Sequence, residues 1–305
     1  MGEAKRRRQA IENGPCPCGS GRAANTCCYQ AGLWHKVAAP LGLRALPPKG
    51  DVAKCYLREL GSCDDGLSAE HLISRGVVRV LTKGGDFTVS GLPWMNEGES
   101  RTLSPEGITA NCLCAKHNSA LSPLDSAARH FFSSLTDCFD EDAKQIRSIV
   151  SGHDIERWLL KTLRAFAVSG NLARGRQRLS GQFATGARFV EMLDDALSWP
   201  DGAGLYCTMR PGDVTTNHAR FRLQPLSNER DEIADVTVDM MGLVFVLRMD
   251  PPESARPEDA MYRPSEIVIR FPRVTHFVVL SWAAGVRSGD ALTMTYAGKA
   301  RGNSI

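Results

Sequence analysis

The pattern of apolar residues divides the chain into a middle part with helical spacing and a C-terminal part with the alternation of strands. In "SPLDSAARHFFSSLTDCF" (residues 122–139) and "HDIERWLLKTLRAFAVSG" (residues 153–170), apolar residues recur every three or four positions. This spacing predicts two helices, the second ending at Ser169-Gly170. A third helix is predicted over "ARFVEMLDDALSWPDG" (residues 187–202), with Pro200 as its stop.

From about residue 203 the period changes to that of strands. The β-rich runs, bounded by Pro, Gly and Asp, are "GLYCTM", "ARFRLQPL", "DVTVDMMGLVFVLRMD", "SEIVIRFP" and "THFVVLSWAA". In the second run, Arg220 and Arg222 alternate with Phe221 and Leu223, which is typical of an edge strand with one basic face. The sequence therefore predicts the α+β class, with a C-terminal region that is first helical and then β-rich.

Composition and charge narrow the class of protein. The longest apolar run, residues 240–247, is too short to span a bilayer, so no membrane segment is expected. Ten cysteines without an export signal favour metal or redox chemistry in a reducing compartment, and we expect a cytoplasmic location. Residues 1–50 carry a net charge of +6 within a total of +3, which suits contact with phosphate or an acidic protein, or serves solubility alone.

Four cysteines near the N-terminus have the spacing of a zinc knuckle. "GPCPCGSGRAANTCC" contains Cys16, Cys18, Cys27 and Cys28 as C-x-C-x8-C-C. Four thiolates complete a tetrahedral zinc shell, and the Pro and Gly residues supply the tight turn. A segment this small depends on the metal for its folding energy. Residues 14–30 resemble the SEC-C motif, which implies a zinc-ordered element that docks a protein partner or nucleic acid.

A second set of soft ligands follows. Cys55 and Cys63 in "KCYLRELGSC" and Cys114 and His117 in "LCAKHN" predict a second, enlarged zinc knuckle, whose last two ligands open a helix. Two alternatives remain at this point. Cys112 takes the place of Cys114 or His117, or His117 belongs to a different metal site.

Between these ligand pairs lies "SAEHLIS", and the whole layout resembles that of the HNH (ββα-metal) endonucleases over residues 55–130. The resemblance implies that Glu70 and Asn118 bind a catalytic Mg²⁺ or Mn²⁺ and that His71 activates water. It also implies that Asn111 braces the loop. The chain departs from the family pattern in two ways: Ser74 replaces a frequent proline, and the helix carries Cys-x2-His in place of Cys-x2-Cys.

The predicted chemistry is hydrolysis of phosphodiester bonds. A metal ion offsets the charge that develops on the phosphate, and an imidazole that titrates near neutrality takes the proton of water. We expect a metal-dependent endonuclease that contains two structural zinc ions and acts on nucleic acid, with DNA favoured. By analogy with this pairing of motifs, its role lies in phage defence or a mobile element. The alternative is a catalytically silent zinc adaptor, in which His71 is a packed histidine and Glu70 a surface carboxylate.

The motifs also predict how the chain is organised. A SEC-C knuckle with its basic arm covers residues 1–34, and a proline-containing linker covers residues 35–50. A treble-clef, ββα-metal HNH module covers residues 51–135, and an α+β accessory domain covers residues 136–305.

Overall fold

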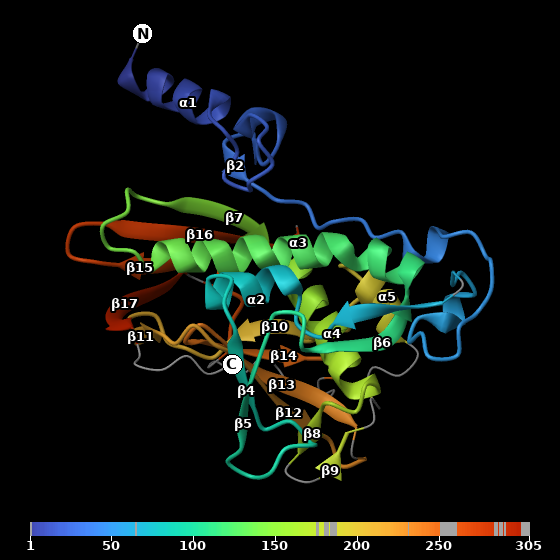
Figure 1. The fold of residues 1–305 in the computed structure, drawn as a ribbon. Coiled ribbons are helices and arrows are strands. Elements are labelled where there is room, and N and C mark those ends of the chain that lie inside the picture. Colours follow the sequence, from blue (N-terminus) through green and yellow to red (C-terminus); the bar gives the residue numbers. More distant parts are fainter. Residues whose placement is uncertain are drawn as a thin grey trace.

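The computed structural model confirms the mixed α+β class (Figure 1). It describes residues 2–64, 66–174, 177–179, 183, 188–230, 232–250, 261–283, 286, 289 and 291–299. One large core joins buried side chains from Leu43 to Met294. This core includes residues from the predicted linker, HNH module and accessory domain, so it does not separate them. The domain boundaries that the motifs indicate stay predictions.

The N-terminal segment is a helix followed by a small loop-rich knuckle. Helix α1 (Glu3–Asn13) stands clear of the rest of the chain, and the knuckle contains η1 (Ala24–Thr26) and the hairpin of β1 (Tyr29–Gln30) with β2 (Leu33–Trp34) (Figure 1). The knuckle in turn lies on strand β7 (Arg147–Ser151), where the amide of Ile149 donates to the carbonyl of Pro17 at 3.3 Å. It therefore covers the outer edge of the sheet to which β7 belongs.

The segment that resembles the HNH family contains two paired strands and a long helix. Strand β3 (Leu67–His71) pairs antiparallel with β6 (Thr109–Cys114), and β6 runs directly into the long helix α3 (Ala115–Cys138). The connection between the two strands contains α2 (Arg75–Thr82) and the hairpin of β4 (Phe87–Ser90) with β5 (Ser100–Leu103). Short 3-10 turns, η2 (Leu43–Ala45) and η3 (Arg58–Leu60), lie in the segment before β3.

Two larger sheets follow in the described part of the C-terminal region. The mixed five-stranded sheet has the order β11 (Val214–Asn217), β17 (Leu292–Lys299), β15 (Glu266–Arg270), β16 (Thr275–Ser281), β7. The antiparallel four-stranded sheet has the order β10 (Gly204–Cys207), β14 (Leu243–Arg248), β13 (Ile233–Met240), β12 (Phe221–Ser227). The strand with the basic alternation, β12, is an edge strand as predicted. Smaller elements are β8 (Ala173–Arg174), β9 (Gln177–Arg178) and α5 (Phe189–Asp194).

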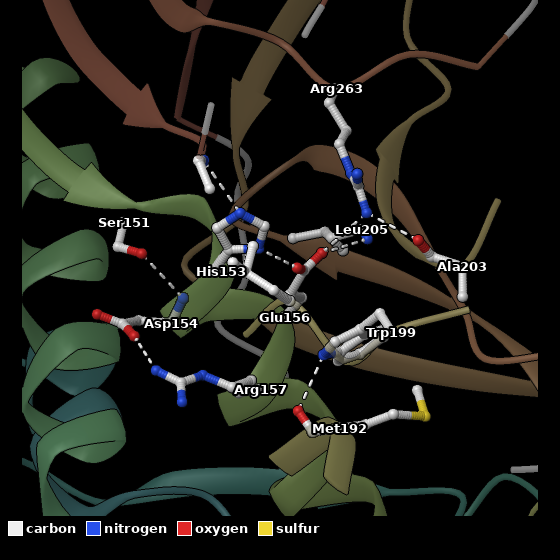
Figure 2. A network of polar contacts seen from close by, with 12 residues as sticks. Ser151, His153, Asp154, Glu156, Arg157, Met192, Trp199, Ala203, Leu205 and Arg263 are labelled. Atoms are coloured by element: carbon white, nitrogen blue, oxygen red, sulfur yellow. Dashed lines mark hydrogen bonds and ion pairs between the residues drawn. The ribbon is translucent and has the colours of Figure 1, made fainter. Parts of the chain in front are cut away.

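Helix α4 (Gly152–Val168) lies at the centre and contacts α3, β6 and strands of both large sheets. Its N-terminus is capped by the Ser151 hydroxyl, which accepts from the amide of Asp154 at 3.2 Å. Figure 2 shows the charged residues of its first turns: His153 contacts Glu156 at 2.6 Å, and Glu156 contacts Arg263 at 3.4 Å. Arg157 contacts Asp154 at 2.6 Å. These buried charges fix α4 against its surroundings.

One sequence prediction needs correction. The third helix ends at Asp194, not near Pro200, because Asp195 is extended and its carboxylate accepts from the amide of Leu197 and the hydroxyl of Ser198. The β-rich run predicted at residues 235–250 is confirmed and belongs to two strands, β13 and β14. They are joined by a turn in which Gly242 has a φ of 92°, and a Cβ there would lie 2.2 Å from the carbonyl oxygen of Thr216.

Candidate metal centres and catalytic site

The second ligand set converges as predicted. Cys55, Cys63, Cys114 and His117 are buried, and one ligand atom from each lies within 4.8 Å of the others. Nδ1 of His117 is 3.3 Å from Sγ of Cys55, 3.3 Å from Sγ of Cys114 and 3.7 Å from Sγ of Cys63. Tetrahedral zinc bonds of about 2.0–2.3 Å separate neighbouring ligand atoms by roughly 3.6 Å. The spacing therefore fits zinc.

The contacts of His117 define its part in this centre. Nδ1 faces the thiols, and Nε2 lies 2.9 Å from the hydroxyl of Ser62. A ligating histidine usually donates its second ring N–H to such an acceptor, which fixes the tautomer and the ring. Cys112, the alternative ligand, lies outside the group.

The pKa values of the thiols reflect their crowding. Burial and the neighbouring Cys55 raise the pKa of Cys63 to about 12. Burial alone would raise the pKa of Cys114, but hydrogen bonds from the backbone and from Cys63 and Cys55 lower it. One thiolate is thus favoured while its neighbours hold their protons, and a bound cation would displace those protons.

The first ligand set, Cys16, Cys18, Cys27 and Cys28, also forms one group within 4.8 Å. Sγ of Cys27 is 3.5 Å from Sγ of Cys18 and 3.6 Å from Sγ of Cys28. Burial would raise the pKa of Cys27, but hydrogen bonds from Ser20 and the other thiols lower it to about 6. The described part of the chain therefore contains two candidate zinc sites, as the sequence predicts.

Strand β3 carries the two candidate catalytic residues next to a β-bulge. Asn111 and Cys112 of β6 together oppose the single residue between Ser68 and Glu70, since Ser68 pairs with Leu113 and Glu70 with Ala110. A bulge twists and bends its strands and is common beside functional sites. Glu70 is buried, and His71 is half-buried. Neighbouring residues of an extended strand point to opposite faces, so a bend is needed to bring Glu70 and His71 to one edge, and the bulge lies next to this pair.

Glu70 has an ionic partner that the sequence does not reveal. Its Oε1 lies 2.8 Å from Nζ of Lys161 on α4, and the same ammonium contacts both carboxylate oxygens of Asp125 on α3 at 2.7 Å. Burial raises the pKa of Glu70, and Lys161 opposes that rise. Burial alone would lower the pKa of Lys161, but Asp125 and Glu70 outweigh it and raise that pKa. Lys161 is therefore a buried ammonium shared by two carboxylates.

The surroundings of His71 favour its neutral form. Burial and Arg75 lower the pKa of His71, although Glu106 and Asp125 oppose that effect. Its Nε2 is buried and has no hydrogen-bond partner among the residues that the structure describes. A neutral imidazole with an open nitrogen is the form that accepts a proton.

Asn118 is oriented by a short chain of hydrogen bonds. Ser68 donates to the carbonyl of Leu113 at 3.2 Å, so its oxygen accepts from Nδ2 of Asn118 at 3.1 Å. Oδ1 of Asn118 has no hydrogen-bond partner among the described residues. Asn111 is exposed on β6, and the described residues supply it with no side-chain hydrogen bond. The described contacts thus join Glu70 to Lys161 and Asn118 to Ser68; none joins Glu70 to Asn118.

Four residues of this site escape sequence reasoning: Tyr56, Ser74, Asp125 and Lys161. Ser74 donates to Asp125 and accepts from the indole N–H of Trp158 at 2.7 Å. The hydroxyl of Tyr56 is buried without a partner in the described structure, and burial together with Glu70, Cys112 and Asp125 raises the pKa of Tyr56. The sequence holds no local signal for Lys161, because it shares a polar helical stripe with Asp154, Arg157 and Arg164 that is typical of a solvated face.

A pocket of about 370 Å³ lies elsewhere, between residues 35–42, the first turns of α4 and the end of α5. His153, Arg157 and Asp194 line it, and none of the candidate catalytic residues does. The charged side chains that line the pocket already have backbone partners. Arg157 donates to the carbonyl of Ala39 at 2.7 Å, and Asp194 accepts from the amide of Leu43 at 2.7 Å. The pocket and the candidate catalytic site are therefore separate.

Comparison with known proteins adds no relative. The chain matches no protein-family model, no curated protein and no solved structure. Within the described residues, no helix is long and apolar enough to cross a membrane. The SEC-C and HNH resemblances therefore rest on the residues themselves.

Proposed function

We propose that this chain is a metal-dependent phosphodiesterase of the HNH type that acts on nucleic acid, with DNA as the favoured substrate. One observation carries the proposal: Nε2 of His71 is buried and has no hydrogen-bond partner among the described residues, and His71 lies next to a buried acidic cluster on the strand pair that leads into a candidate zinc site. This is the environment of a general base. The second candidate zinc site supports the proposal, because its ligands Cys114 and His117 join the end of β6 to the start of α3.

In this proposal each residue has a distinct part. Nε2 of His71 accepts the proton of the attacking water, and the lowered pKa keeps the ring unprotonated at neutral pH. Glu70 and Oδ1 of Asn118 are the donors for a divalent cation. The hard oxygen chemistry of these donors fits Mg²⁺ or Mn²⁺, and the unpartnered hydroxyl of Tyr56 leaves a polar position for water in the same cluster. When bound, such a cation would offset charge on the phosphate.

The N-terminal helix supplies a phosphate contact in this scheme. Lys5 and Arg6 are exposed on α1, which stands clear of the body (Figure 1). Cationic side chains on a free helix suit the phosphate backbone without reading its sequence. We place recognition of the backbone there, and a protein partner of the SEC-C knuckle is the other proposed use of this end.

A second candidate function is the catalytically silent zinc adaptor, and a specific observation favours it. Glu70 is already neutralised by Lys161 at 2.8 Å, and Asn118 is bonded to Ser68. A chain that binds zinc and nucleic acid without hydrolysis would need no more than the two cysteine-rich centres.

A plasmid-nicking assay separates the two functions. The zinc-loaded full chain should cleave in Mg²⁺ or Mn²⁺ and not in excess EDTA, and His71→Ala should reduce the rate about 10²–10⁴-fold with its zinc retained. His218→Ala, another half-buried histidine, is the matched control and should cleave as wild type does. Equal cleavage by His71→Ala and wild type would end the nuclease assignment, and zinc-loaded wild type without cleavage would favour the adaptor.

A further inference from the structure

The cluster at Glu70 is built by two parts of the chain that are far apart in the sequence. Glu70 belongs to β3 and Asp125 to α3, both within the ββα unit, whereas Lys161 comes from α4. The side chains of Lys161 and Glu70 are only 3% and 4% exposed, and that of Asp125 is 29% exposed. The buried side chain of Lys161 thus reaches Glu70, the candidate metal ligand, from α4. The carboxylate of Asp125, in contrast, is partly open to solvent.

Lys161 is held in this position by its helix. In the preceding turns of α4, Glu156 accepts from the amide of Leu205 at 2.9 Å (Figure 2). Arg157 donates to the carbonyl of Ala39. Since these contacts fix the rotation of α4, the ammonium of Lys161 is directed between the two carboxylates. Its position depends on the C-terminal part of the chain.

The charges of the cluster do not balance. Two carboxyl groups face one ammonium, so the cluster carries one net negative charge when both are ionised, in a largely buried place. The hydroxyl of Tyr56 has no hydrogen-bond partner in the described structure. The charges of Glu70 and Asp125 act on this hydroxyl and, after burial, help to raise the pKa of Tyr56. Excess negative charge and an open polar atom both indicate that the cluster accepts a further cation or its water.

We propose that Lys161 competes with a divalent cation for Glu70, so that its ammonium sets the metal affinity of the site. This inference rests on the proposed function. In the resting protein Lys161 neutralises Glu70 and holds it next to Asp125. A divalent cation binds Glu70 when the ammonium of Lys161 moves toward Asp125. The ammonium already contacts both carboxylate oxygens of Asp125. Lys161 is therefore a positioning residue, and α4 links the state of the C-terminal sheets to metal binding.

The test measures Mn²⁺ binding by the zinc-loaded full chain, with free Mn²⁺ followed by electron paramagnetic resonance. Lys161→Met keeps the length of the side chain and removes the charge, and should lower the Kd at least about tenfold. Lys161→Arg keeps the charge and should keep the weak binding of wild type. Lys144→Met, the same change at an exposed lysine, is the matched control and should leave the Kd unchanged. Glu70→Gln identifies the site, because it should abolish this binding.

A second measurement covers the case in which Lys161→Met folds poorly. Lys161→Gln removes the charge but retains a donor for the carboxylates, and Mn²⁺ should raise its melting temperature more than that of wild type. Equal Kd values for wild type, Lys161→Met and Lys161→Gln, with binding lost in Glu70→Gln, would refute competition and leave the metal site intact. No binding to any of these proteins at millimolar Mn²⁺ would refute the metal site itself, and the inference with it.

Discussion

The hydrogen bond behind the second metal centre offers a sharp test of that centre. Ser62 and His117 are both fully buried, and the Ser62 hydroxyl lies 2.9 Å from Nε2 of His117. Since Nδ1 faces the thiols, Nε2 would carry the proton and donate to Ser62 when Nδ1 binds zinc. Ser62→Ala removes the acceptor without touching a ligand, at a position that is fully buried.

Two independent arguments give the same magnitude. A buried donor without an acceptor costs about 1–3 kcal/mol. Loss of the partner that orients a ligating histidine lowers metal affinity about 10–100-fold, which corresponds to about 1.4–2.7 kcal/mol. The variant should therefore hold one zinc ion about 10–100-fold more weakly, and the zinc-loaded protein should unfold at a lower temperature.

Competition with a chromogenic chelator measures both zinc ions in one titration. Wild type should release two zinc ions per chain, and in Ser62→Ala only one of them should become weaker, because the N-terminal knuckle serves as an internal standard. Ser134→Ala, a substitution at another buried serine, should leave both affinities unchanged. Ser62→Ala with two zinc ions of wild-type affinity would refute the role assigned to His117.

Two further predictions concern the contact between the knuckle and the body. Burial lowers the pKa of His130, which packs against Gly19, below its ordinary 6.5, so below about pH 6.5 the unfolded chain binds more protons than the native one. Stability should therefore fall as the pH falls through that value, and His130→Gln should show a smaller fall in acid unfolding curves; an unchanged pH profile would contradict this. Deleting residues 1–34 should lower the free energy of unfolding by up to about 3 kcal/mol in urea titrations, because Ile149 becomes exposed. Deleting residues 2–13 should not lower it. Equal stability of the two truncated proteins would refute the contact between the knuckle and β7.

The zinc ligands were predictable because their chemistry is carried by residue type and spacing. Few side chains other than Cys and His bind zinc, so Cys114-x2-His117 at a helix start and two upstream cysteines suffice to define the group. The long helices were predictable for a similar reason, since periodicity is local. Strand β7 was not predicted, because its five residues gain their place by pairing with β16, far along the chain.

The partners of the candidate catalytic residues could not be predicted from the sequence. Glu70 meets Lys161 across 91 positions, and nothing in either neighbourhood specifies the other. Asp125 appears in the sequence as one polar position of an amphipathic helix, and only the packing of α3 on α4 turns it toward Lys161. Ionic pairing in a core is a property of the assembled structure, whereas a ligand pattern is a property of the segment.

The charges along α4 have a consequence for the uniqueness of the fold. Asp154 and Arg157 bind the segment before η2, Glu156 binds β10 and Arg263, and Lys161 binds β3 and α3. Sliding α4 by one turn, or rotating it by one residue, would leave several of these groups buried and unpaired at once. Apolar side chains alone would tolerate such a shift far better, because Leu and Ile pack in many arrangements. We infer that the helix gains a single register from these ion pairs, and that they exclude misassembled cores more than they strengthen the native one.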